Sequence, residues 1–327
     1  MRLYFLSAIW LLFLGSWVSA CTEQPTRGGR KVTTPLLIVI DGATDSLLSI
    51  DPTQKDLGEF QLFKGSLDTV IIHGRKFYRT ESDYFMTEND LKRAFEYRTF
   101  WMKRFSIHPE PTLIIYFDAR KGDVIHPKPL DIGFAFVQNS FTPEEYQIVK
   151  AAMLTAITDW EQTCHVRFNY QEDLDKSLKV GLTPPELSFT IEKFVPKTST
   201  DWYAKAPLPN DELEYRQLLV TPVFFSASFS KAGIMRHEIG HILGFLHEHL
   251  QQAAPKECPD EADINYRSLT AYDSLSVMHP FCMVGYGAKE FKITKTDREA
   301  ASCIYCLEER KEECKAKKQY VQRGREY

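Results

Sequence analysis

Several compositional features that would assign a protein to a class at once are scarce in this chain of 327 residues. Gly and Pro number only 16 and 17 and follow no period, which excludes a collagen-like or other fibrous protein. Neither charge sign dominates, because 40 Lys and Arg stand against 44 Asp and Glu, leaving a net charge of −4. This balance gives no whole-chain electrostatic reason to expect nucleic acid as a partner. We also find no internal repeat and no long low-complexity segment.

The composition that remains is that of a folded protein. Hydrophobic residues make up 43% of the chain and aromatic residues 13%, which excludes a disordered solvating chain. The length suggests about two domains. Seven cysteines are the unusual entry in the composition, and their meaning depends on the compartment.

The first 20 residues predict export. Met1 and Arg2 give a short positive start, the run from Leu3 to Val18 is almost wholly apolar, and Val18-Ser19-Ala20 is a small-residue cleavage context. The run is shorter than the roughly 20 residues that a membrane-spanning helix needs. We therefore interpret residues 1–20 as a signal peptide.

The residue after this signal is a cysteine, Cys21. The tetrad Val18-Ser19-Ala20-Cys21 resembles the lipobox of bacterial lipoproteins, which implies lipidation of Cys21. The alternative is an ordinary secretory signal followed by an incidental cysteine. Residues 21–32 are polar and rich in Gly and Pro, as expected of a flexible tether. The resemblance implies a membrane partner through a lipid anchor on a bacterial membrane, facing the periplasm or the cell exterior.

If Cys21 is lipidated, an even number of cysteines remains. In an exported chain these favour disulfides over reduced thiols, and the sequence alone does not choose among the pairings. The pair Cys303-x-x-Cys306 also fits a zinc or redox site, but no second C-x-x-C completes a zinc set. The disulfide candidates are Cys164, Cys258, Cys282, Cys303, Cys306 and Cys314.

Residues 33–125 predict a small α/β domain that serves as a spacer or pro-domain. Strand-like runs occupy 35–42, 69–78 and 113–117, and a helical pattern capped by Thr87 occupies 87–105. We identify no chemistry there. The connector at 120–130 is rich in Pro and charge and predicts a domain boundary.

A second domain is expected over residues 126–306. A strand at 131–137 leads to a helix that starts at Thr142, with Pro143 at its first position and Glu145 forming a capping box with Thr142. Alternation predicts a strand at 164–170, and further strand-like runs occupy 187–194 and 217–225. The remaining residues 307–327 form a charged tail.

The most informative segment is HEIGHILGFLHEH, at residues 237–249. His237 and His241 stand four apart, so on a helix both imidazoles project from one face and can reach one ion. Gly244 favours a left-handed helix end, and a sharp turn there would bring His247 back as a third ligand. Glu238 lies about 100° around the helix, beside the ion rather than on it.

This arrangement has a clear chemical use. Three neutral nitrogen ligands leave a position for water, whose pKa zinc lowers toward 7. Glu238 would act as general base for that water and as acid for the leaving amine. The alternative is an amphipathic helix with incidental histidines.

The pattern His237-Glu238-x-x-His241-x-x-Gly244-x-x-His247 matches the metzincin zinc metallopeptidase signature, and Glu248 makes it resemble the astacin branch. Residues 272–279 (YDSLSVMH) resemble the Met-turn, which implies that Met278 lies under the imidazoles as a structural residue. The resemblance covers about residues 130–306. It implies an α+β fold: a twisted, mostly parallel sheet with an antiparallel edge strand, an active-site helix, the Met-turn and a C-terminal helix at 292–306.

The sequence departs from astacins in two respects. The position after Met278-His279 is Pro280, where astacins usually have a Tyr that assists the oxyanion; Tyr286 is a weak substitute. Astacin pro-segments also use an Asp in a Gly-Asp context, and Gly122-Asp123 is such a pair, although an ordinary turn is the favoured interpretation. A cysteine switch is excluded, because the only upstream cysteine is Cys21.

Resemblance to astacins also implies that Cys164 pairs with a C-terminal cysteine, for which Cys306 is our choice. Cys258 and Cys282 flank the approach to the Met-turn. A disulfide between them would close the loop between His247 and Met278 and would leave Cys303 to pair with Cys314.

The sequence therefore predicts an exported metalloendopeptidase with one zinc ion, acting on proteins or peptides. His237, His241 and His247 are the expected metal ligands and Glu238 the expected general base. An extended substrate is expected to add to an edge strand upstream of the helix, such as 217–225. The alternative is a surface-anchored zinc-containing binding module that does not cleave.

Overall fold

The structure is a computed structural model that describes residues 54–80, 83–93, 95, 114–118, 122–197, 200–248, 266–270, 272–279 and 290–305. These residues belong to one compact unit spanning Pro35–Tyr327. Within the described part, no helix is long and apolar enough to cross a membrane. The following expectations lie outside the described residues: the signal peptide, Cys21 and its tether, the strand at 35–42, Cys258, Pro280, Cys282, Tyr286, Cys306, Cys314 and the tail.

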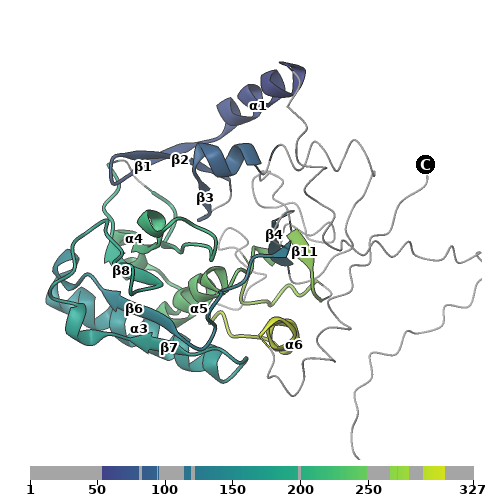
Figure 1. Cartoon of the computed structure of the whole chain (residues 1–327). Coiled ribbons are helices and arrows are strands. Elements are labelled where there is room, and N and C mark those ends of the chain that lie inside the picture. The colour runs from purple at the N-terminus through teal and green to yellow at the C-terminus, as the bar shows by residue number, and fades with distance from the viewer. Residues whose placement is uncertain are drawn as a thin grey trace, which may run out of the picture. The chain divides into compact units, whose positions relative to one another are not determined.

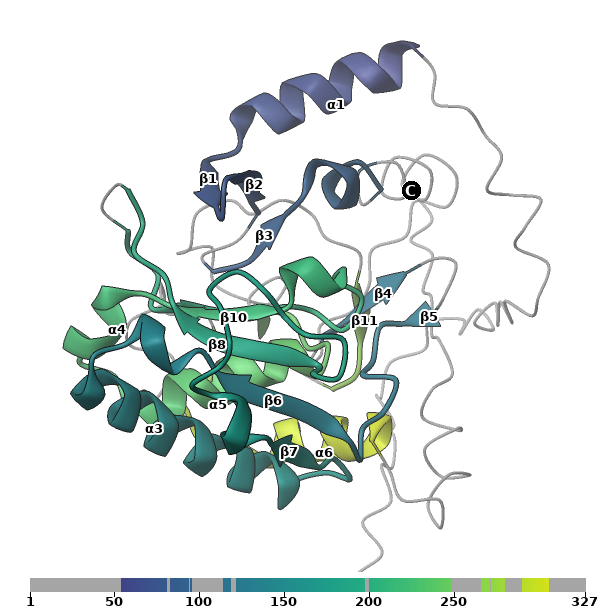
Figure 2. The ribbon, with the colours of Figure 1, turned by 60° about the vertical axis from the view of Figure 1, so that its left-hand side comes forward.

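The central feature is a five-stranded sheet with the order β7-β6-β8-β10-β9 (Figures 1 and 2). The first four strands are mutually parallel, and β9 pairs antiparallel with β10 at one edge. The mixed α/β fold with a mostly parallel sheet is thus confirmed. The strands are β6 (Ile132–Phe136), β7 (Phe168–Tyr170), β8 (Phe189–Lys193), β9 (Ala204–Lys205) and β10 (Gln217–Val220).

The prediction of an edge strand at 217–225 is wrong. β10 lies between β8 and β9, so the edge belongs to β9, two residues that hydropathy does not single out. The predicted run also ends early, because Pro222 occupies the first turn of the short helix α4 (Pro222–Ser226).

Two helices cover one face of the sheet. α3 (Pro143–Glu161) begins at the predicted capping box, in which the Thr142 hydroxyl accepts from the Glu145 amide and the Glu145 carboxylate accepts from the Thr142 amide. α5 (Lys231–Ile242) packs along α3 and begins at Ser230, whose side chain accepts from the Gly233 amide. Trp160 of α3 donates its indole N–H to the Arg236 carbonyl at 2.8 Å, which ties the two helices together.

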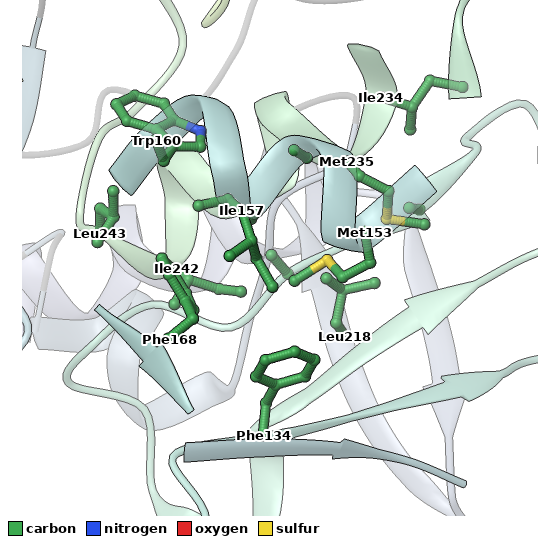
Figure 3. Close-up of a cluster of buried hydrophobic side chains, with 14 of the residues drawn as sticks. Phe134, Met153, Ile157, Trp160, Phe168, Leu218, Ile234, Met235, Ile242 and Leu243 are labelled. Atoms are coloured by element: carbon green, nitrogen blue, oxygen red, sulfur yellow. The ribbon is translucent and has the colours of Figure 1, made fainter. Parts of the chain in front are cut away.

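The side chains of β6 point alternately into two buried clusters on opposite faces of the sheet. Ile132, Phe134 and Phe136 face the helices and belong to the main buried cluster, with Phe134 pointing toward α3 in Figure 3. Ala135 and Val137 face the opposite side and pack with a separate, smaller cluster. The strand is therefore buried on both faces, as expected for an inner strand of a parallel sheet.

The N-terminal elements lie on the side of the central sheet opposite α3 (Figures 1 and 2). They are α1 (Gln54–Ser66) and a three-stranded antiparallel sheet of β1 (Thr69–Ile72), β2 (Arg75–Arg79) and β3 (Phe85–Met86). The single strand predicted at 69–78 is in fact a hairpin. His73 and Gly74 form its two-residue turn, with positive φ angles of 47° and 81°.

A third sheet joins segments from both sides of the predicted boundary. β4 (Ile114–Asp118) pairs with β5 (Gly122–Asp123) and with β11 (Tyr266–Ser268). The predicted strand at 113–117 is present as β4. The predicted C-terminal helix is present as α6 (Lys295–Ile304). Short 3₁₀ helices occupy Gln138–Ser140, Glu172–Leu174 and Leu213–Tyr215.

Two of the disulfide candidates are described, and both are free thiols in the structure. Cys164 is buried, and burial raises the pKa of its thiol to about 12, so it is unreactive at neutral pH. Cys303 is partly exposed on α6. Their predicted partners, Cys306 and Cys314, lie outside the described residues, and the pairings stay predictions.

Candidate metal centre

The site is built on the end of α5. Phe245 donates its amide to the Gly240 carbonyl and Gly244 donates to the His241 carbonyl, which together form a Schellman motif. Gly244 has a φ of 96°, and a Cβ there would lie 2.1 Å from the Val124 carbonyl oxygen. Only glycine satisfies both conditions, and the resulting turn reverses the chain directly after the helix.

This reversal brings His247 to the histidines of the helix. Its Nε2 lies 3.0 Å from Nε2 of His237, and the rings of His241 and His247 have centroids 4.9 Å apart. All three side chains are buried, with His237 and His247 at 0% exposure and His241 at 2%. The structure thus brings together the three histidines that the sequence pattern singled out.

Two of the imidazoles are oriented by backbone carbonyls. Nδ1 of His237 lies 2.8 Å from the Val277 oxygen, and Nδ1 of His241 lies 2.8 Å from the Phe245 oxygen. Because a carbonyl only accepts, Nδ1 carries the proton in each ring and Nε2 presents a lone pair to the centre. Such an outer contact is the usual way in which a metal-binding histidine is fixed.

A fourth group, Asp83, enters from the N-terminal segment just before β3. Its Oδ1 lies 2.9 Å from Nε2 of His247, and its Oδ2 lies 3.5 Å from Nε2 of His237. The side chain of Asp83 is 1% exposed. Sequence reasoning missed this residue, since it stands in a polar stretch with no motif around it. The candidate that the sequence offered, Asp123, lies instead in β5.

These four residues fit a zinc ion. One ligand atom from each of Asp83, His237, His241 and His247 lies within 4.8 Å of all the others. Tetrahedral ligands at about 2.0–2.1 Å from zinc lie roughly 3.3 Å apart, which falls inside the 2.9 to 4.0 Å that separate the Asp83 oxygens from the three Nε2 atoms. Nε2 of His241 is buried with no hydrogen-bond partner in the described part of the chain, a cost that a metal bond would remove.

The electrostatics also suit a cation. Burial lowers the pKa of His237 and of His241, so both rings are neutral at pH 7, the form that binds metal. Burial opposes ionisation of Asp83, but His247 and His237 beside it hold the pKa of its carboxyl well below the usual range. The centre therefore offers the neutral nitrogens of His237 and His241, the imidazole of His247 and the Asp83 carboxylate, all of them buried.

Beneath the helix runs the turn that contains Met278. A Cβ on Gly240 would lie 2.2 Å from the Met278 sulfur, so the methionine packs directly against the backbone of α5. Asp297 holds this turn by accepting from the Ser276 hydroxyl at 2.7 Å and from the Val277 amide at 2.9 Å. Since the Val277 carbonyl orients His237, Asp297 supports a ligand through one intervening residue.

Glu248 supports the same turn from above. Its amide donates to the Met278 carbonyl at 2.9 Å, and its carboxylate accepts from the Asp273 amide at 2.9 Å. The side chain of Glu248, which is 0% exposed, thus stabilises the turn at residues 272–279.

Glu238 is buried beside the centre and does not belong to the four-residue group. Burial raises the pKa of its carboxyl well above the usual value, and the negative charge of Asp83 raises it further. Lys205 of the edge strand β9 is also buried, and its charge acts in the opposite direction on Glu238. Lys205 is a second residue that the sequence did not single out.

Comparison with known proteins gives limited information. No protein-family model and no curated protein matches this chain. Among solved structures, the chain is similar to high choriolytic enzyme 1, a hatching enzyme zinc-protease from the medaka fish Oryzias latipes, with 16% sequence identity and a TM-score of 0.36. The match covers 56% of this chain and 94% of that chain.

Proposed function

We propose that this protein is a zinc-dependent endopeptidase of the metzincin type, held in a latent form by its own N-terminal segment. The observation that supports this most is the convergence of His237, His241 and His247 with Asp83 in a buried group of zinc-binding size. Three nitrogens come from the helix and its turn. The fourth position, which a catalytic zinc keeps for water, belongs to Asp83.

The residues around the centre have distinct roles in this proposal. A bound zinc would supply Lewis acidity and lower the pKa of a water molecule in the fourth position. Glu238 accepts the proton of that water and passes it to the leaving amine. Displacing Asp83 removes a negative neighbour of Glu238, which lowers the pKa of the Glu238 carboxyl toward the ionised form that a base requires.

The substrate is proposed to bind as an extended strand along β9. Ala204 and Lys205 form the edge of the central sheet, and among the described strands none pairs with the outer side of β9. Backbone groups on such an edge can pair with an added strand. β9 contacts α5, so a peptide there passes beside the histidines.

A second candidate function rests on the same four residues. Structural zinc sites are closed by four protein ligands, and Asp83 completes such a set. If Asp83 never leaves, the chain is a non-cleaving zinc protein in which the metal joins the N-terminal segment to the rest of the fold.

The test compares full-length chains that carry Asp83→Ala with and without Glu238→Gln. Each is loaded with zinc, assayed for metal content and incubated with a denatured protein substrate. We expect cleavage by Asp83→Ala that a chelator abolishes. In the double variant we expect a loss of at least about a hundredfold with zinc retained. Zinc binding without cleavage by Asp83→Ala would favour the closed structural site.

The sequence of residues 1–32 carries a further part of the proposal, export and a lipid anchor at Cys21. The expected measurement is the mass of the N-terminal peptide of the mature protein. A lipid-modified peptide starting at Cys21 supports the anchor, and an unmodified thiol at Cys21 contradicts it.

A further inference from the structure

The segment that carries Asp83 also places an aromatic side chain in a buried apolar cluster with Trp202. Phe85 stands two residues after Asp83, at the start of β3, and is 5% exposed. Its ring meets the indole of Trp202 in an edge-to-face contact, with centroids 5.4 Å apart. Phe85, Trp202 and Leu219 belong to one buried apolar cluster.

The part of this cluster that we call the pocket consists of three residues outside the N-terminal segment, Trp202, Phe194 and Leu219, while Ile72 and Phe77 of β1 and β2 also belong to the cluster. Trp202 stacks on Phe194 with centroids 5.9 Å apart and planes 18° from parallel, which fixes the indole. Thr221 donates its hydroxyl to the Trp202 carbonyl at 2.7 Å, which fixes the backbone there. Leu219 of β10 completes the wall. The pocket is thus held by contacts that do not depend on Phe85.

The pocket lies where an extended peptide would pass. Trp202 stands two residues before Ala204, the first residue of β9, so it adjoins the sheet edge proposed to bind substrate. Residues i and i+2 of an extended chain are about 6.6 Å apart. A side chain in the position of Phe85 is therefore within about two residues of the group that occupies the metal centre.

Occupation of this place by the protein's own chain indicates what the pocket accepts. Removing Phe85 would uncover part of the Trp202 indole, inside a buried apolar cluster that also contains Leu219. The charged neighbour is Arg79, whose guanidinium lies 6.0 Å from the centroid of the Phe85 ring. Aromatic rings suit such a surface because they bury a large area and pack edge-to-face on an indole.

We propose that Trp202, Phe194 and Leu219 form a specificity pocket that selects a substrate with an aromatic or other large apolar side chain within three residues of the cleaved bond. This inference rests on the proposed function. It assigns a substrate class to the site, with Trp202 as the residue that sets it.

The experiment uses the full-length, zinc-loaded chain with Asp83→Ala and Phe85→Ala, so that the chain's own ring does not fill the pocket. Cut sites in denatured proteins are mapped by mass spectrometry, and a preferred site is then remade as a pair of peptides that differ only by Phe or Ala at the enriched position. We expect enrichment of Phe, Tyr, Trp, Leu and Met at one fixed position, and a preference of about tenfold or more for the Phe peptide.

Two further variants test the pocket itself. Trp202→Ala is expected to reduce the Phe-over-Ala preference to less than about threefold while the Ala peptide is still cut, and Trp202→Phe to restore most of it. Tyr203→Ala is the matched control, because Tyr203 is the neighbouring aromatic but packs on Phe229 with centroids 5.7 Å apart. This control should keep the preference.

The outcomes separate the two levels of the proposal. Cleavage with no preference at any position, or a preference that Trp202→Ala leaves unchanged, overturns the pocket and leaves the peptidase intact. No cleavage by Asp83→Ala overturns the peptidase, and the pocket as a substrate site with it. If Trp202→Ala does not fold, Trp202→Phe against Trp202→Leu decides, since only the first keeps an aromatic face.

Discussion

Oδ1 of Asp83 lies 2.9 Å from Nε2 of His247, although the two residues come from opposite sides of the predicted domain boundary. The contact joins the segment before β3 to the turn after α5 at the candidate metal centre. A zinc ion bound by both residues would therefore hold two separate parts of the chain together, and metal loss should affect the stability of the whole fold.

The first prediction concerns metal removal. Zinc that binds only the folded state stabilises it by about 2.7 kcal/mol when present at 100 times its dissociation constant. We expect a chelator to lower the melting temperature of the full-length chain by several degrees, and zinc to restore it. Differential scanning calorimetry with and without chelator measures this. His241→Ala should abolish the response, and an unchanged response in that variant would show that the zinc binds elsewhere.

A second prediction concerns Asp297, which touches none of the histidines. It accepts from Ser276 and Val277, and the Val277 carbonyl orients His237. Asp297→Ala should weaken zinc binding about 10- to 100-fold, the usual effect of losing an outer partner of a ligand. Competition with a fluorescent zinc chelator gives the affinity. The exposed Asp173 is the control: Asp173→Ala should bind zinc as tightly as the natural chain.

The turn after α5 allows a sharp test of backbone conformation. Gly244→Ala places a side chain at a φ of 96° and against the Val124 carbonyl. We expect a loss of at least about 2 kcal/mol in the free energy of unfolding, together with weaker zinc binding, because His247 shifts. Gly58→Ala is the control, since nothing lies within 4 Å of its Cβ in α1 and alanine favours a helix. An equal effect of both substitutions would contradict the account of the turn.

The fourth prediction is a pH dependence of stability through His126. Burial, with a smaller effect of Arg216, lowers the pKa of His126 to about 4 from an ordinary 6.5. Above pH 6.5 the residue is neutral in both states and its contribution is fully present. Between pH 6.5 and 4 only the unfolded state takes up the proton, so stability falls as the pH falls, by about 3 kcal/mol in total.

His126→Gln removes this part of the pH dependence. Chemical denaturation at pH 7 and pH 4.5 should show a smaller loss of unfolding free energy in the variant than in the natural chain. Equal losses in the two proteins would mean that His126 titrates normally in the folded state.

The fold was predictable where local signals and burial agree. The capping box at Thr142 and the apolar stripe of α3 placed that helix correctly, and the runs at β4 and β6 are strands as expected. The hairpin at His73–Gly74 was missed because its two-residue turn is too short to separate β1 from β2 in the sequence pattern. β9 was missed because a two-residue edge strand has no periodicity, and its pairing with β10 exists only in the tertiary structure.

The site residues, too, could be predicted only where a local sequence pattern brings them together. His237, His241 and His247 could be predicted because a helix and one glycine turn bring them together within eleven residues. Asp83 lies far away in the sequence and reaches the centre only because β1–β3 pack over the sheet, so no local pattern reports it. Lys205 and Trp202 could not be identified from the sequence for a similar reason. Each matters because it lies on or beside β9, the edge strand that was not predicted.

If Asp83 keeps a zinc peptidase latent, replacing it should raise the rate of cleavage. The rate of peptide-bond cleavage is compared for three full-length, zinc-loaded chains: the natural sequence, Asp83→Ala, and the control Asp123→Ala. We predict that Asp83→Ala cleaves at least about tenfold faster than the natural chain and that Asp123→Ala does not differ from it, with one zinc in each. Equal rates in the natural chain and in Asp83→Ala, at equal zinc content, would contradict the account.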